Sequence, residues 1–379
     1  MSAVLPPLAP ASTAPTRAEL PARGLLTGRH RGAVLVALVA VAVVVPVLNL
    51  AVPAGNAFHL SEYAVQLTAK IMCYAMAALA MDLIWGYSGI LSLGHGVFFA
   101  LGGYVMGMYL MRQIGRDGNY RSDLPDFMVF LNWKALPWTW GLSDSFAATL
   151  VLVVTVPAAL AFVFGYFAFR SRIKGVYFSI ITQAMTFAMM LLFFRNETGF
   201  GGNNGFTDFK RILGHPIATP SMRMTLFVIT GLTLIGFFVL ARWLVGSKFG
   251  RVLQAIRDAE TRVMFTGYDP LRYKLAIWVI SAVMCGIAGA LYVPQVGIIN
   301  PGEMSTAASI EIAIWAAVGG RGTLIGPIVG AFFVNGAKSW FTQAFPEIWL
   351  YFLGALFILV TLFLPQGIVG LVRRRRAAA

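Results

Sequence analysis

The sequence predicts an all-α polytopic membrane protein with about ten transmembrane helices. Of its 379 residues, 58% are apolar and only 12% are charged, whereas about 25% of the residues of a soluble domain are charged. The apolar runs are about 20 residues long and do not alternate with polar residues, which is typical of membrane-spanning helices. Because backbone polar groups inside a bilayer must be satisfied within a helix or a closed barrel, we expect each run to be a helix.

The two ends of the chain are basic. Residues 1–32 are rich in Ala and Pro and contain four arginines, which predicts a disordered cytoplasmic tail. Residues 372–379 contain four consecutive arginines and predict a second cytoplasmic tail. Residues 33–371 are expected to form a single transmembrane domain. The first apolar run, residues 33–52, is longer than the about 7–15 apolar residues of a signal peptide, so we interpret it as an uncleaved span.

The basic stretches between the apolar runs support a count of ten spans. With ten spans, the tails and the basic loops at 170–174 and 242–274 all face the cytoplasm, as the positive-inside rule requires. The segments 112–145 and 195–223 then lie outside. Nine spans would place the two basic tails on opposite sides of the membrane. The predicted spans are residues 33–52, 63–85, 90–111, 146–169, 176–194, 224–245, 273–294, 306–319, 324–342 and 347–366.

Glycines recur at a spacing that favours close helix packing. Gly103 and Gly107 are four residues apart, as are Gly326 and Gly330, and small residues at this spacing let helix backbones approach each other in lipid. Glycine is also common where helices break around a transport site. The glycine-rich stretches 86–96 and 318–327 are candidates for such breaks, although plain helix packing is an alternative.

Most catalytic chemistry lacks a signature. The phosphate-loop pattern G-x-x-x-x-G-K-[ST] does not occur, and the near match at 330–339 has the wrong spacing. The four histidines lack metal-ligand spacing, and Cys73 and Cys285 lie inside apolar runs as small hydrophobic residues. The net charge of +14 is explained by arginines in loops and tails rather than by nucleic-acid binding. We expect a protein that is not an enzyme and needs no cofactor or metal.

Residues 246–270 form a long predicted cytoplasmic loop and contain an amphipathic helix. Asp258 is a candidate cap for a second helical turn, and Gly267 is a candidate terminator. Such a helix can bind a groove in another protein or lie on anionic lipid, and the residues alone favour neither interpretation. Its apolar face consists of Phe249, Val252, Leu253 and Ile256.

Several long motifs resemble the permeases of branched-chain amino-acid ABC importers. They are "WGYSGILSLGHGVFFALGGY" (85–104), "AIRDAETRVMFTGYDPLRYKL" (255–275), "AGALY" (288–292) and "AVGGRGTLIGPIVGA" (317–331). The finer resemblance is to the urea branch of that family, its C permease subunit. It rests on "LPDFMVF" (124–130), "RSRIKGVYFSIITQAM" (170–185), "FFRNETGFGGNNGFTDFK" (193–210), "LYVPQVGIINPGEMS" (291–305), "KSWFTQAFPEIWLYFLGALFILVTLFLPQGIVGL" (338–371) and Asp82.

This resemblance implies an ABC importer permease with inverted repeats, in the bacterial plasma (inner) membrane. Its implied partners are a second permease subunit, two ATP-binding subunits that hydrolyse ATP, and a periplasmic or extracellular substrate-binding protein, besides membrane lipid. Residues 246–270 correspond to the ATPase-coupling region, which favours the protein-binding interpretation. Glu260 and Gly267 match the acid and the glycine of the coupling motif, whereas Thr261 and Arg262 replace its usual alanines.

The resemblance also directs attention to polar residues inside the apolar runs, because a carboxylate near a helix centre costs about 2.5–3.5 kcal/mol and usually marks a pathway. A urea site needs hydrogen-bond acceptors, donors and flat walls. Alternatively, Glu311 pairs with Arg321 or bonds to a neighbouring helix, and Asp82 serves gating or helix packing. The candidates are Glu311 and Asp82 as acceptors, Tyr87 and Gln183 as donors, and Trp315 as a flat wall one turn from Glu311.

Two other functions compete with urea import. The same machine for branched-chain amino acids would need a cation or a helix N-terminus to bind the carboxylate. An autonomous channel or secondary transporter would need a cluster of buried charges, for which Lys70, Asp82 and Glu311 are the candidates.

Overall fold

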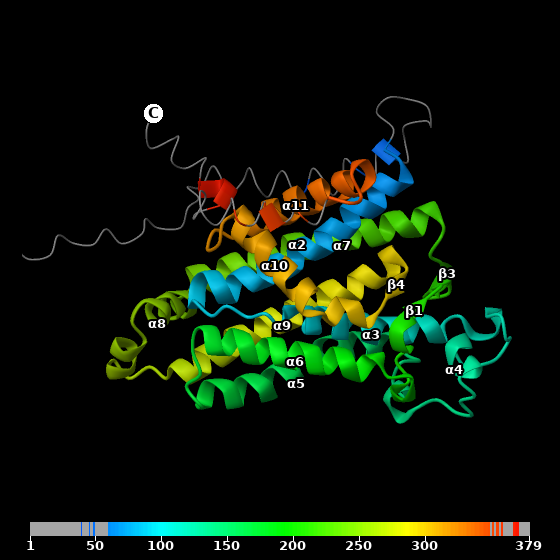
Figure 1. Ribbon diagram of the computed structural model, residues 1–379, viewed down its shortest axis with the longest axis horizontal. Coiled ribbons are helices and arrows are strands. Elements are labelled where there is room, and N and C mark those ends of the chain that lie inside the picture. The colour runs from blue at the N-terminus through cyan, green and yellow to red at the C-terminus, as the bar shows by residue number, and fades with distance from the viewer. Residues whose placement is uncertain are drawn as a thin grey trace, which may run out of the picture.

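The computed structural model describes residues 60–348, together with residues 39, 45, 48, 49, 351, 354, 355, 358 and 367–370. This part of the chain is a helical bundle whose long helices run roughly along one direction (Figure 1). Its long helices are α2 (Glu62–Ser88), α3 (His95–Arg112), α5 (Phe146–Arg170), α6 (Val176–Phe194), α7 (Pro220–Gly246), α8 (Lys248–Phe265), α9 (Pro270–Val296), α10 (Thr306–Gly319) and α11 (Ile325–Ala344).

The predicted spans between residues 63 and 342 each coincide with one of these helices. Five of the described helices, α2, α5, α6, α7 and α9, are long and apolar enough to cross a membrane, whereas α10 is shorter. The predicted spans 33–52 and 347–366 and both predicted tails lie outside the continuously described residues. The count of ten spans, the inverted repeats and the sidedness of the termini therefore stay predictions.

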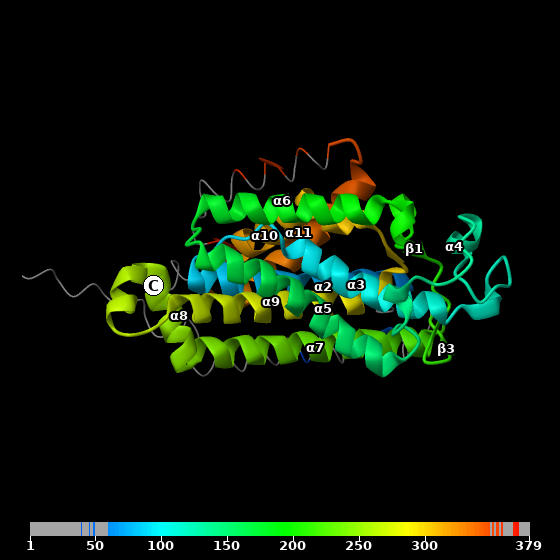
Figure 2. The same cartoon turned by 90° about the horizontal axis from the view of Figure 1, so that it is seen from below.

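The core of the bundle is formed by α2, α3 and α9. Figure 2 shows α2 and α9 between α6 on one side and α7 on the other. At the crossing of α3 and α9, a Cβ on Gly102 would collide with the backbone of Gly286, so only glycine permits this approach. By contrast, α5 and α6 expose large apolar side chains such as Phe167 and Phe187, as expected of helices that face lipid.

The predicted glycine pair on α11 has a similar packing role. A Cβ on Gly330 would collide with the carbonyl of Trp315 on α10, and Gly326 packs against Gly319. The α10–α11 pair is therefore held at a backbone-to-backbone distance that larger residues would not allow. Gly107 instead packs against the side chains of Phe206 and Ile299, while Gly103 lies against Ile299 and the backbone of Gly289 on α9.

The two ends of the bundle differ in their connections. At one end lie α4 (Asp126–Phe130) and short antiparallel strand pairs, while α8 lies at the opposite end (Figure 1). We refer to the end at α8 as the coupling end. The strand pairs are β1 (Phe206–Thr207) with β4 (Ile298–Ile299), and β2 (Arg211–Ile212) with β3 (His215–Pro216).

Helix α8 differs from its predicted form in one respect. Asp258 does not cap a second helix but forms an ion pair with Arg257 at 2.9 Å. The helix bends at Ala259, whose φ of −157° and ψ of 72° are non-helical, and then continues to Phe265. Gly267 lies beyond the helix end with φ +83°, a left-handed conformation that favours glycine, so it marks the terminus as expected.

Candidate functional site

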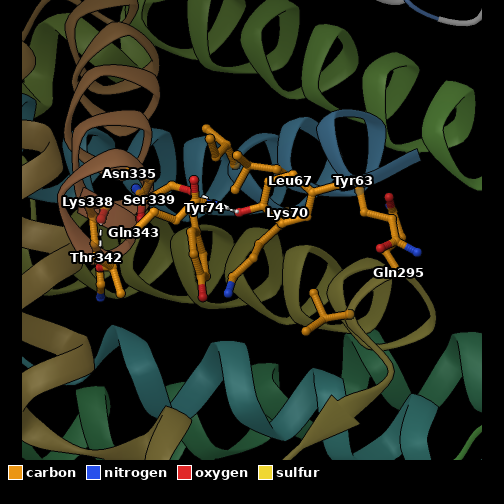
Figure 3. Close-up of a pocket in the computed structure, with 13 residues that line it drawn as sticks. Tyr63, Leu67, Lys70, Tyr74, Gln295, Asn335, Lys338, Ser339, Thr342 and Gln343 are labelled. Atoms are coloured by element: carbon orange, nitrogen blue, oxygen red, sulfur yellow. Dashed lines mark hydrogen bonds between the residues drawn. The ribbon is translucent and has the colours of Figure 1, made fainter. Parts of the chain in front are cut away.

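A cavity of about 360 Å³ lies between α2, the C-terminal end of α9 and α11 (Figure 3). The lining side chains on α2 and α11 recur every three or four residues, because that spacing places them on one helix face. Most of them are polar, although they belong to apolar helices. The lining residues are Tyr63, Gln66, Leu67, Lys70, Ile71 and Tyr74 on α2, Gln295 and Val296 on α9, and Asn335, Lys338, Ser339, Thr342 and Gln343 on α11.

Sequence reasoning missed most of this lining. It considered Lys70 only as an ion-coupling charge, and it treated 330–339 only as a near match to a phosphate loop. The signal was present in the spacing: Asn335, Lys338 and Thr342 interrupt an apolar run at intervals of three and four residues. Polar residues at that spacing in a membrane helix indicate a wetted face.

Glu311 lies behind the cavity wall and pairs with Lys338. The Nζ of Lys338 is 2.9 Å and 3.0 Å from the two carboxylate oxygens of Glu311. The expected pair between Glu311 and Arg321 is therefore wrong, whereas the other alternative, a bond to a neighbouring helix, is confirmed by Lys338 on α11. Because Lys338 itself lines the cavity, Glu311 influences the cavity through this lysine.

An aromatic cluster forms the inner wall of the cavity. The ring of Trp315 lies 4.7 Å from the ring of Tyr74, centroid to centroid, so Trp315 stands one layer behind the lining. Its Nε1 is buried and has no hydrogen-bond acceptor among the described residues. The hydroxyls of Tyr74 and Tyr292 are 3.5 Å apart, and Tyr292 in turn donates to the Glu303 carboxylate at 3.1 Å.

Asp82 and Tyr87 lie together, but at the coupling end rather than at the cavity. The fully buried Asp82 carboxylate accepts hydrogen bonds from the backbone N–H groups of Gly322 and Leu324, at 2.5 Å and 3.2 Å. The Tyr87 hydroxyl donates to the Gly322 carbonyl at 2.9 Å. Both side chains thus hold the turn between α10 and α11, which supports the packing interpretation of Asp82. Arg321 in that turn lies over the ring of Trp85 at 5.2 Å.

Gln183 is separate from both groups. It lies half-buried on α6, a helix that does not line the cavity. This helix packs against the loop after α2, where the Ser179 hydroxyl donates to the Leu91 carbonyl at 2.8 Å. The structure therefore places Glu311 and Trp315 directly behind residues that line the cavity, Lys338 and Tyr74, and leaves the other three candidates elsewhere.

The apolar face of α8 is covered by the chain itself. Leu253 and Ile256 are only 2% exposed, Val252 is also buried, and the Phe249 ring stacks on Tyr273 of α9 at 5.4 Å. Periodicity predicted these four side chains as one apolar face, and the family resemblance implied its role in ATPase coupling. In the structure this face packs against the chain itself, and of the four only Phe249 is partly exposed. The exposed apolar side chains of α8 are instead Met264 and Phe265, and Phe265 is 92% exposed.

Glu260 follows the kink of α8 and joins two other segments. Its carboxylate oxygens lie 2.7 Å from Lys174, between α5 and α6, and 2.6 Å from Lys274 on α9. Burial raises the pKa of the Glu260 carboxyl, but the hydrogen bonds and charges of the two lysines outweigh this and leave the pKa below its usual value. Glu260, the acid of the predicted coupling motif, therefore connects α8 to two other segments of the same chain.

Comparison with known proteins shows which family the chain is similar to. The family model described as "Branched-chain amino acid transport system / permease component" matches residues 63–361. The chain is 25% identical over 339 residues to the high-affinity branched-chain amino acid transport system permease protein LivM of Salmonella typhimurium, which covers 83% of this chain and 72% of the relative. It is 24% identical over 313 residues to the corresponding protein BraD of Pseudomonas aeruginosa, covering 78% of this chain and 91% of the relative.

The permease protein LivH of Escherichia coli is 22% identical over 303 residues, covering 78% of this chain and 91% of the relative. No solved structure matches the chain. The family match extends over all the helices from α2 to α11, which include both the cavity and the coupling end. The chain therefore belongs to the family of permease components of branched-chain amino acid transport systems.

Proposed function

We propose that this chain is a membrane permease subunit of an ATP-driven importer and forms one side of its translocation path. Family membership supports this role. Separate ATP-binding subunits supply the energy, because the sequence has no phosphate loop of its own. A second permease subunit completes the path, and a substrate-binding protein delivers the solute.

The observation that carries this proposal is the polar cavity on apolar helices. A cavity lined by Lys70 and Lys338, with Glu311 paired to Lys338 behind the wall, is costly inside a bilayer, and such residues usually mark a substrate path. A volume of about 360 Å³ is large enough for a solute of amino-acid size.

Branched-chain amino acids are the substrate that the relatives favour, since their printed names specify branched-chain amino acid transport. The cavity offers matching chemistry. Lys70 is a cation for the substrate carboxylate, and its Nζ stands 5.7 Å from the Tyr74 ring centroid at the cavity wall. Leu67, Ile71 and Val296 offer apolar contact to the substrate side chain.

Urea is the second candidate, and the character of the lining favours it. Four amide side chains, Gln66, Gln295, Asn335 and Gln343, line the cavity. Each amide can accept from an N–H group and donate to a carbonyl, which suits a small neutral molecule with both kinds of group.

Uptake into proteoliposomes containing the full transporter distinguishes the two substrates. Labelled leucine and labelled urea are compared with and without ATP inside, for the wild-type chain and for Lys70→Met. If leucine is the substrate, Lys70→Met lowers its uptake about tenfold, because a charge-assisted hydrogen bond contributes about 1.5–3 kcal/mol. If urea is the substrate, the wild type takes up urea, and the loss in Lys70→Met is smaller. ATP-dependent uptake of neither solute would reject both assignments.

A further inference from the structure

Side chains on both sides of the kink in α8 contact other helices of the bundle. Two residues flank the non-helical Ala259: Arg257 two positions before it and Glu260 one position after it. Both side chains leave α8 and bind other parts of the bundle. The family resemblance implies that α8 couples to the ATP-binding subunits. These contacts therefore determine which helices move when α8 moves.

Arg257 connects the kink to α2. Its Nη1 donates to the carbonyl of Gly86 at 2.8 Å, while its Nε pairs with Asp258 at 2.9 Å. Its aliphatic part lies over Gly89, which ends α2 with φ +75°, and a Cβ there would stand 2.6 Å from the Arg257 Cγ. The guanidinium therefore lies directly against the C-terminal end of α2.

Glu260 connects the kink to α9. The carboxylate binds Lys274, in the second turn of α9, at 2.6 Å, and binds Lys174 beside α6 at 2.7 Å. The Lys274 side chain is only 10% exposed. An ion pair so far shielded from water is stiffer than a surface pair, since breaking it leaves a poorly solvated charge.

The end of α2 in turn holds the start of α11. Asp82 accepts hydrogen bonds from Gly322 and Leu324, and Leu324 is the residue that precedes the first turn of α11. Gly86 packs against the same turn, where a Cβ would stand 2.6 Å from the Gly322 nitrogen. Backbones in such close contact move together, because interiors at this density have no room to slip.

Helices α2, α9 and α11 are the three helices that line the cavity. We propose that the kink of α8 is the joint that passes movement of the coupling segment to the cavity, with Arg257 as the positioning residue for α2 and, through Asp82, for α11. Glu260 performs the same task for α9. This inference rests on the proposed function, since it needs ATP-binding subunits that move α8.

The alternative is that Arg257 only stabilises the end of a helix. A cation near a helix C-terminus stabilises the helix by its charge alone. Arg257→Lys keeps that charge but cannot bind Gly86 and Asp258 at once. If Arg257 only stabilises the helix end, Arg257→Lys should behave like the wild type. If Arg257 transmits movement from α8 to α2, Arg257→Lys should not.

The experiment follows the cavity directly in the full reconstituted transporter. Ser339→Cys places a thiol in the cavity wall, and its labelling rate is measured with a charged maleimide before and after trapping with ATP and vanadate. The chain without Ser339→Cys gives the background from the buried Cys73 and Cys285. Arg257→Ala and Arg257→Lys are then combined with Ser339→Cys.

We expect trapping to change the labelling rate in the chain with the native Arg257. In Arg257→Ala and Arg257→Lys this change is lost, while the ATP-binding subunits still co-purify and still hydrolyse ATP. Arg251→Ala, on the same helix, keeps the wild-type change. ATP hydrolysis without a change in the labelling rate of the cavity thiol would show that movement of α8 no longer reaches the cavity.

Several results would overturn the inference. A wild-type change in Arg257→Lys would leave only the stabilising role, and loss of the ATP-binding subunits from both variants would make Arg257 a docking residue. If Arg257→Ala does not accumulate, Arg257→Lys alone decides. These outcomes differ from failure of the proposed function, in which the wild type itself takes up neither leucine nor urea.

Discussion

The two ends of α2 use polar residues in opposite ways. At the coupling end, Asp82 is completely buried, and its carboxylate accepts hydrogen bonds from backbone N–H groups of one turn. At the other end, Gln66 and Lys70 face a cavity. The same helix is thus close-packed over its last two turns and open over its first three.

This difference teaches that a polar residue in a membrane helix has to be judged by what surrounds it. A carboxylate that accepts two backbone hydrogen bonds fixes shape, since removing it leaves buried donors unsatisfied. A lysine at a cavity wall is free to interact with a solute. Substitutions that disturb the packing around Asp82 should therefore change stability, and substitutions of Lys70 should change transport.

The largest expected effect is at the coupling end. Gly86→Val places a branched side chain where even a Cβ would stand 2.5 Å from the Asp82 carboxylate and 2.6 Å from the Gly322 nitrogen. We expect a loss of about 3 kcal/mol, seen as a collapsed yield of monodisperse protein in detergent. Gly236→Val on α7 is the matched control, because nothing lies within 4 Å of its Cβ position. Equal yields for the two variants would break the comparison.

An intermediate effect is expected at the Glu311–Lys338 pair behind the cavity. Glu311→Leu leaves the half-buried Lys338 without its carboxylate, which lowers stability by about 2 kcal/mol. The double change Glu311→Leu, Lys338→Leu should recover most of this loss, measured as the melting temperature in detergent. A double variant as unstable as Glu311→Leu would show that the pair is not the source of the loss.

The smallest expected effect is at Glu260. The pKa of this carboxyl is lowered in the folded chain, so its ion pairs add stability above its ordinary pKa and lose it as the pH falls through the lowered value. We expect Glu260→Gln to cost about 1 kcal/mol near neutral pH. The difference in melting temperature from the wild type should shrink below about pH 4. A difference that grows on acidification would contradict the sign of the shift.

Apolar runs predicted the helices of the described region well, because twenty apolar residues leave the backbone few other states in a bilayer. The spacing of apolar residues did not reveal which part of the protein covers the apolar face of a helix. Periodicity predicted the apolar stripe of α8 with Leu253 and Ile256, but not that the neighbouring helices of the same chain bury it. An apolar stripe is equally suited to a partner and to its own chain.

The candidate site was predictable only in part for a related reason. Asp82, Glu311 and Trp315 stood out as polar or aromatic residues in apolar runs, and all three are buried or half-buried. Their partners depend on how the helices pack. Glu311 lies 27 residues before Lys338, and no local spacing rule connects the two.

The contact between Asp82 and Gly322 also bears on how the protein is made, because these residues are 240 positions apart in the chain. At about 5–20 residues per second, a ribosome needs about 12–48 s to pass from one to the other. During this interval α2 is already synthesised, yet its carboxylate has no backbone donors. The nascent chain must keep Asp82 hydrated or shielded at the insertion machinery until the turn before α11 emerges. The α10–α11 turn therefore completes the end of α2, and a chain truncated before Gly322 should be recognised as unfinished by the proteases that survey the membrane.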